Sequence, residues 1–118
     1  MTDQDRSAVR TIFDACGTQD EVKHEREIDL LTGFSGTGPA FPALLAAAMM
    51  KVATAYGLDR EIARRAATAV LVGAGGLLRH RNEDPEQIVN AFVEYRGITS
   101  AGIDAMRHAG FEAIVSRT

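Results

Sequence analysis

The chain has 118 residues, a length that suits one domain and hardly allows two. Hydrophobic residues make up 46% of the chain and charged residues 25%, which are ordinary values for a soluble globular protein. The formal net charge of -3, with no basic run between aromatic residues, argues against a nucleic-acid partner.

Residues 1–24 are predicted to form an amphipathic helix that stops at Gly17 and then a charged linker or short strand. Apolar side chains recur at helical spacing: Val9, Ile12, Phe13 and Cys16. This pattern predicts core packing for Cys16, and a lone cysteine suits a reducing cytoplasm, our expected location. No apolar core follows a basic start, so no secretory signal is predicted. The stretch "IDLLTGF" is interpreted as a last turn before a break.

The stretch "SGTGPAFP", residues 35–42, is the clearest break in the chain. Gly36 and Gly38 allow sharp backbone turns, and Pro39 fits the first position of a helix. The helix that follows is nearly uncharged and is predicted to stop near Gly57.

A second long helix is predicted over residues 58–82, with Asp59 as its N-cap. Its interior holds Gly73, Gly75 and Gly76, each of which costs about 1 kcal/mol in an exposed helix. These glycines therefore predict close packing against another backbone, or a kink. Three shorter helices follow, at 84–93, 99–110 and 111–118, the first of them with Asp84 as cap and Pro85 at its first position. No period-2 alternation of useful length appears, so the chain is predicted to be all-α.

The apolar helices at 39–56 and 66–78 have too few partners in a chain this short. Neither apolar stretch reaches the roughly 18–20 residues that span a bilayer, so no membrane partner is expected. A helix that is apolar all round must be covered on all sides, and obligate interfaces resemble a core cut in half. We therefore predict a homodimer, and leave open whether dimers assemble further.

The loop "EYRGITS", residues 94–100, is the strongest local candidate for a binding site. A threonine beside unpaired N–H groups at a helix start can hold a carboxylate through Thr99. The alternative is that Thr99 serves only as an N-cap, and local chemistry alone favours this second reading. The three histidines do not stand at metal-ligand spacing, so no metal site is predicted: His24, His80 and His108.

Residues 25–118 carry motifs that together resemble the C-terminal dimerisation domain of the pyrroline-5-carboxylate reductase family. The matching features are Thr32, "SGTGPAF" at a helix start, Gly57-Leu58, the helix "VLVGAGGLL", Pro85 and Gly110-Phe111. The resemblance implies an interlocked helical domain of the pyrroline-5-carboxylate reductase and 6-phosphogluconate dehydrogenase C-terminal type. Within it, the helix-start motif falls on Ser35, Gly36, Gly38 and Pro39.

The family reduces the C=N bond of 1-pyrroline-5-carboxylate to give proline, with NAD(P)H bound by a preceding Rossmann domain. The family's carboxylate-binding threonine falls on Thr99 and its second loop glycine on Gly97, with Ile98 between them. The resemblance thus implies a small imino or amino acid as ligand. No Rossmann domain and no catalytic residue is recognised in this chain, so alone it is expected to bind no dinucleotide and to be inactive. Its missing domain would belong to the same protein or to a separate subunit.

The loop departs from the family pattern at three positions. Glu94, Tyr95 and Arg96 stand where the family has serine, proline and glycine. Glu94 would repel a carboxylate unless it is paired, whereas Arg96 could clamp one with two hydrogen bonds. These changes suggest a related substrate rather than a lost site. The alternative is a stand-alone, non-catalytic helical module that only assembles or binds.

Overall fold

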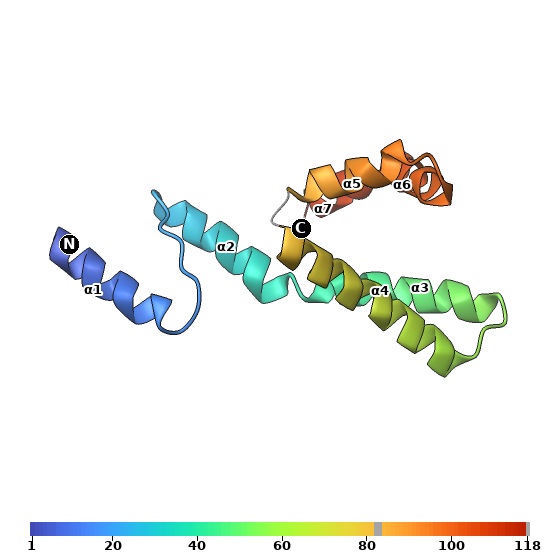
Figure 1. Cartoon of the computed structure of the whole chain (residues 1–118), viewed down its shortest axis with the longest axis horizontal. Coiled ribbons are helices and arrows are strands. Elements are labelled where there is room, and N and C mark those ends of the chain that lie inside the picture. The colour runs from blue at the N-terminus through green and yellow to red at the C-terminus, as the bar shows by residue number, and fades with distance from the viewer. Residues whose placement is uncertain (82–83, 118) are drawn as a thin grey trace. The chain divides into compact units, whose positions relative to one another are not determined.

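The computed structural model describes residues 1–81 and 84–117, and helices are its only regular elements (Figure 1). In chain order they are α1 (Asp3–Asp14), α2 (Glu25–Thr37), α3 (Ala40–Ala55), α4 (Arg60–Arg81), α5 (Pro85–Glu94), α6 (Ile98–His108) and α7 (Phe111–Val115). The all-α prediction is confirmed. The predicted ends of two helices, at Asn82 and Thr118, lie outside the described residues. The chain divides into two compact units, Met1–Ala48 and Met49–Thr118, and each is described by itself.

In the first unit, α1 begins with a capping box. The backbone N–H of Asp5 donates to Thr2 Oγ1 at 3.2 Å, and the Thr2 N–H donates to Asp5 Oδ2 at 2.8 Å. The Thr2 backbone N–H and, after it, the Thr2 side chain hold the pKa of the Asp5 carboxyl below its usual range. The helix ends at Asp14, three residues before the predicted stop at Gly17. Cys16 is exposed in this chain, so its predicted core packing is wrong for the chain by itself; Ile12 and Phe13 of the same apolar stripe are exposed too, because the described chain leaves that face of α1 uncovered.

A charged linker or short strand was predicted before the first glycine cluster, but α2 already begins at Glu25. Glu27 Oε2 caps this helix by accepting from the backbone N–H groups of Lys23, at 2.7 Å, and His24, at 3.0 Å. Acidic residues in a first turn also stabilise a helix start. The interpretation of "IDLLTGF" as a last turn was therefore wrong: the charges that suggested a linker are the helix's own start signal.

The break between α2 and α3 is narrower than predicted. Gly36 lies inside α2, so its expected sharp turn is absent, and the interruption is confined to Gly38 and Pro39. Gly38 itself has right-handed helical angles, and a Cβ there would clash with the carbonyl oxygen of Phe34. The glycine is needed at this position for close approach rather than for a left-handed turn.

The helical run Glu25–Ala55 has a mean hydropathy of 1.3 and is long and apolar enough, by length and composition, to cross a membrane. The apolar stretches counted from the sequence are shorter because they leave out α2. A core helix of a water-soluble protein can pass the same test, but no part of this window is buried inside the chain. Its apolar surface must therefore be covered by something outside this single chain.

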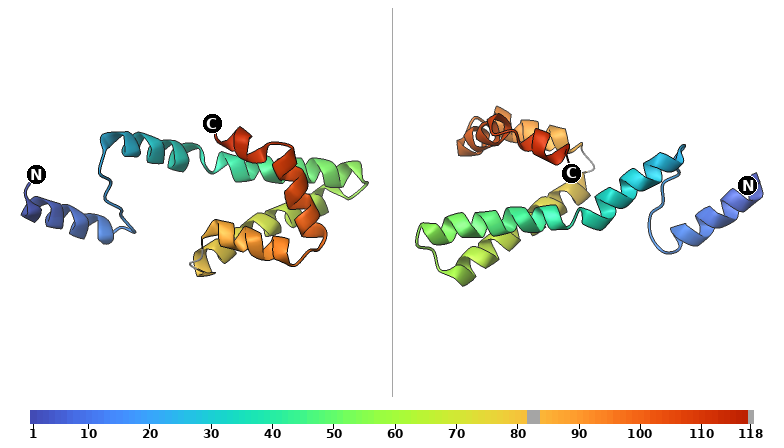
Figure 2. Two further views of the ribbon diagram at one scale, coloured as in Figure 1. Left: turned by 90° about the horizontal axis from the view of Figure 1, so that it is seen from above. Right: turned by 180° about the vertical axis from the view of Figure 1, so that it is seen from behind.

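In the second unit, the predicted caps of α4 and α5 and the predicted stop at Gly57 are confirmed. Asp59 Oδ1 accepts from the N–H groups of Glu61 and Ile62, at 2.9 and 3.1 Å, and Asp84 caps α5 through the N–H of Glu86 at 2.8 Å. Gly57, with φ at 89°, makes the left-handed turn that ends α3. The helices α5 and α6 contact each other, as do α6 and α7, and Figure 2 shows the three close together.

Very little apolar surface is buried. The buried apolar side chains among the described residues are those of Ala63, Ala67 and Ile88. On α4, Val70 and Val72 remain 53% and 69% exposed, and a Cβ added at any of its three interior glycines would meet nothing. The close backbone neighbour predicted for these glycines is therefore not found within the second unit, and a second subunit remains its predicted source.

Candidate functional site

The candidate site is the turn between α5 and α6, which the backbone shapes with little help from side chains. The Arg96 N–H closes the end of α5 by donating to the Val93 carbonyl at 3.1 Å. Gly97 is the N-cap of α6, in an extended conformation, and provides no side-chain cap. The Ser100 N–H donates to the Gly97 carbonyl at 3.1 Å. Two N–H groups at the start of α6, those of Ile98 and Thr99, thus have no partner in the described chain.

The reading of Thr99 as an N-cap is wrong, because Gly97 occupies that position and Thr99 is the second residue of the helix. The backbone N–H groups of Ile98, Thr99 and Ser100 were expected to be unpaired. That of Ser100 is bonded to Gly97, and those of Ile98 and Thr99 are unpaired in the described chain. The Thr99 hydroxyl forms no hydrogen bond within the described residues, and the residue is exposed. The turn therefore presents two N–H donors and one hydroxyl at the positive end of a helix dipole, which is an arrangement suited to a carboxylate.

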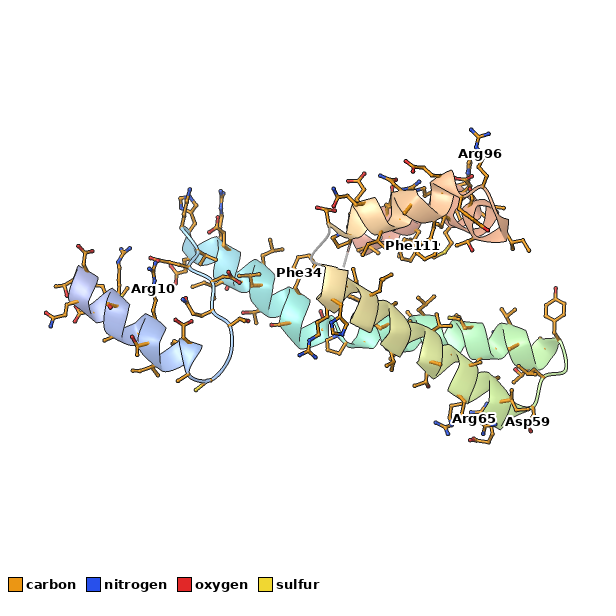
Figure 3. All side chains as sticks on the ribbon, viewed as in Figure 1. Arg10, Phe34, Asp59, Arg65, Arg96 and Phe111 are labelled. Carbon is orange, nitrogen blue, oxygen red and sulfur yellow. The ribbon has the colours of Figure 1, made fainter. Side chains whose placement is uncertain are left out.

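The three residues that depart from the family pattern all face solvent. Glu94 and Arg96 are exposed and Tyr95 is 87% exposed, and Figure 3 shows the Arg96 side chain projecting away from the helices. Glu94 and Arg96 form no ion pair with each other among the described side chains. The carboxylate of Glu94 is therefore not neutralised within this turn, and the guanidinium of Arg96 is available to a ligand.

Arg96 adopts a left-handed conformation, with φ at 51°, which was not predicted. It stands where the resembled loop has its first glycine, whereas Gly97, at φ -95°, needs no glycine for conformational reasons. The only signal in the sequence was the mismatch itself, a bulky residue at a glycine position.

We expect Arg96→Gly to raise the free energy of unfolding, by up to about 1 kcal/mol. The substitution removes a left-handed L-residue, which costs roughly 1–2 kcal/mol, and part of this gain is lost to the greater freedom of glycine in the unfolded chain. Urea unfolding of the two proteins at equal concentration measures the difference. An equal loss of stability instead would mean that the Arg96 side chain makes a contact that holds the turn.

Ser35, Gly36, Gly38 and Pro39 belong to the first unit, and their role in binding stays a prediction. His24 and His80 are exposed, and His108 Nδ1 lies 2.7 Å from the carbonyl oxygen of Asp104, one turn earlier in α6. Among the residues described, no group of histidine, cysteine and carboxylate side chains is placed to bind a metal.

Comparison with known proteins decides the family. The family model described as pyrroline-5-carboxylate reductase dimerisation matches residues 25–118. The chain belongs to this family. Pyrroline-5-carboxylate reductase from Synechocystis is 34% identical over 116 residues, covering 98% of this chain and 43% of the relative. Pyrroline-5-carboxylate reductase 3 from rat is 30% identical over 110 residues, covering 93% of this chain and 40% of the relative.

A solved structure supports the same assignment. The pyrroline carboxylate reductase of Plasmodium falciparum, crystallised with NADP bound, superposes with a TM-score of 0.74 at 26% identity. It covers 98% of this chain, and the chain covers 46% of it. The chain thus spans less than half the length of these reductases, and what it matches is their helical dimerisation domain. The resemblance inferred from the sequence motifs is confirmed.

The residues of this dimerisation domain do not fit a dinucleotide site. Dinucleotide crevices form where a strand enters a helix through a glycine-rich turn. The described residues contain no strand, and the glycines of "SGTGPAF" lie at the end of α2. The NADP seen with the Plasmodium enzyme therefore has no corresponding crevice in the helices described for this chain.

Proposed function

We propose that this chain is the dimerisation and substrate-binding part of a pyrroline-5-carboxylate reductase-like enzyme. That enzyme would reduce the C=N bond of a small cyclic imino acid in the route to proline, in the cytoplasm. A bound NAD(P)H supplies the hydride, held by a nucleotide domain or subunit outside the residues described. No catalytic residue is assigned to this chain, and by itself it should be inactive.

One observation carries the proposal, namely the unpaired N–H groups of Ile98 and Thr99 beside the free Thr99 hydroxyl. The substrate and its product both bear a carboxylate, and such donors at a helix start stabilise an anion without a further charged side chain. Gly97 leaves the approach to these donors open, because it has no side chain. Binding here would fix the charge of the substrate and so orient its ring.

Arg96, Tyr95 and Glu94 are proposed to adjust which imino acid is bound. Arg96 offers a planar, two-pronged donor that can add to the hold on a carboxylate. Glu94 forms no ion pair among the residues that the structure describes, so it would favour a ligand that presents a positive charge, as a protonated imine or a ring ammonium does. The proposed ligand is therefore 1-pyrroline-5-carboxylate or a close relative of the same charge.

The family assignment to a dimerisation domain supports homo-oligomers, and we propose a homodimer. The uncovered apolar surface of the helices between residues 25 and 78 agrees with this assembly, and we propose a protein partner there rather than a membrane. No nucleic-acid partner is proposed, because the net charge is -3. The boundary between a linker at 1–24 and a domain at 25–118 remains part of the proposal.

Titration with proline, followed by the amide signals of the chain, tests the carboxylate site. Saturable shifts of the Ile98 and Thr99 amides are expected, while amides in α1 stay unchanged. A parallel titration with pyrrolidine, which has the ring but no carboxylate, should leave both signals in place. If proline moves neither signal, the stand-alone structural module becomes the better reading.

A further inference from the structure

Two arginines of α1 share one carboxylate of the segment that follows it, residues 18–24. Arg6 Nη1 donates to Glu21 Oε1 at 2.9 Å, and Arg10 Nη2 donates to Glu21 Oε2. Arg6 and Arg10 are four residues apart, so they lie on one face of α1. Figure 3 shows Arg10 on the side of α1 that faces this segment. Both oxygens of the Glu21 carboxylate are thus engaged from a single helix face.

Apolar packing contributes little to holding this segment. Val9 and Phe13 of α1, with Val22, line an open cavity of about 520 Å³. Val9 is 43% exposed and Phe13 58% exposed, so neither is covered well enough for burial to fix the segment. The two arginines also hold the pKa of the Glu21 carboxyl below its usual range, Arg10 first by its hydrogen bond and charge. The Arg6, Arg10 and Glu21 side chains are themselves 51%, 54% and 43% exposed, so any hold on the segment comes from the two ion pairs acting together on one carboxylate.

We propose that Glu21 is an electrostatic latch that fixes residues 18–24 against α1, and that removing its charge frees them as a flexible tether. The latch lies just before residues 25–118, which match the dimerisation family. The similarity to the Synechocystis reductase covers 98% of the chain and so includes α1. The closed latch thereby sets the path on which the chain enters the dimerisation domain. This inference does not depend on the proposed substrate.

The latch is tested by measuring backbone order parameters of residues 18–24 by ¹⁵N relaxation in the full chain. In the natural sequence we expect values near those of rigid backbone, about 0.85. Glu21→Gln keeps the side-chain shape and removes the charge, and it should lower the values at residues 19–22 below about 0.6. Arg10→Gln should act in the same direction.

Asp20→Asn is the matched control, because Asp20 is the neighbouring acid and forms no ion pair within the described residues. It removes the same charge and should leave the order parameters unchanged. The amide signals of α5 and α6 report whether each variant is still folded. The latch is refuted if residues 19–22 are already flexible in the natural sequence. It is equally refuted if they stay rigid in folded Glu21→Gln.

Discussion

Val72→Asp should convert the protein to a monomer at micromolar concentration. Val72 lies in the middle of α4 and is 69% exposed in the single chain, so a charge there costs the isolated chain little. In a dimer that covers α4, the same carboxylate would be buried without a partner, at a cost of about 3–5 kcal/mol. A penalty of that size weakens association by more than about 100-fold.

Sedimentation at several concentrations measures the change, and circular dichroism checks that the helices persist. Arg60→Asp is the control: it also introduces an acid into α4, but at the exposed first residue of the helix, where negative charge is favourable. It should leave the dimer intact. A well-folded monomer of the natural sequence at micromolar concentration would remove the dimer prediction altogether.

Gly97→Ala should weaken proline binding about tenfold or more while leaving the fold unchanged. The backbone of Gly97, at φ -95°, suits any residue, and an added Cβ would lie 3.5 Å from a ring carbon of Tyr95, an ordinary contact. The methyl group would, however, stand where a carboxylate must approach the free N–H groups. A loss of about 1.4 kcal/mol corresponds to the tenfold effect.

Thr99→Val tests the hydroxyl separately, since it keeps the backbone donor and the shape of the side chain. Losing a hydrogen bond to a charged group costs about 1.5–3 kcal/mol, so affinity for proline should again fall at least about tenfold. Gly102→Ala is the control for both variants. It lies in α6 where an added Cβ meets nothing, and it should raise helix stability by up to about 1 kcal/mol without changing affinity. If affinity survives both Gly97→Ala and Thr99→Val, the carboxylate site is elsewhere.

Local signals made two helix starts predictable, those of α4 and α5. Asp59 and Asp84 were recognised as caps because short side-chain acceptors before an apolar run satisfy the first N–H groups of a helix, and the structure has both bonds. The start of α2 was missed, although Glu27 caps it from within the same segment. The charged residues before Ile28 were interpreted as a solvated linker. In the structure, Glu25 and Glu27 instead form part of the first turn of α2.

The position of the candidate turn could be predicted from the sequence, but the N-cap of α6 and the backbone angle of Arg96 could not. Whether Thr99 or Gly97 caps α6 depends on a shift of two residues at the helix start, and N-cap preference alone favours the threonine hydroxyl. The left-handed angle of Arg96 could not be predicted, because an arginine rarely adopts it. Only the way α5 ends and α6 begins imposes that angle on this residue.

By itself, the sequence determined the all-α class, the caps at Asp59 and Asp84 and the family, because these depend on local hydrogen bonding, periodicity and motif spacing. The tertiary structure decided two further matters: which donors at Ile98 and Thr99 stay unpaired, and how little of the apolar surface one chain covers. The second could not be read from composition, since an apolar helix has the same sequence whether its own chain or another molecule buries it. Burial depends on contacts between residues far apart in the sequence or on another molecule. In the described chain, most of the large apolar side chains are exposed, as expected if a second subunit covers them.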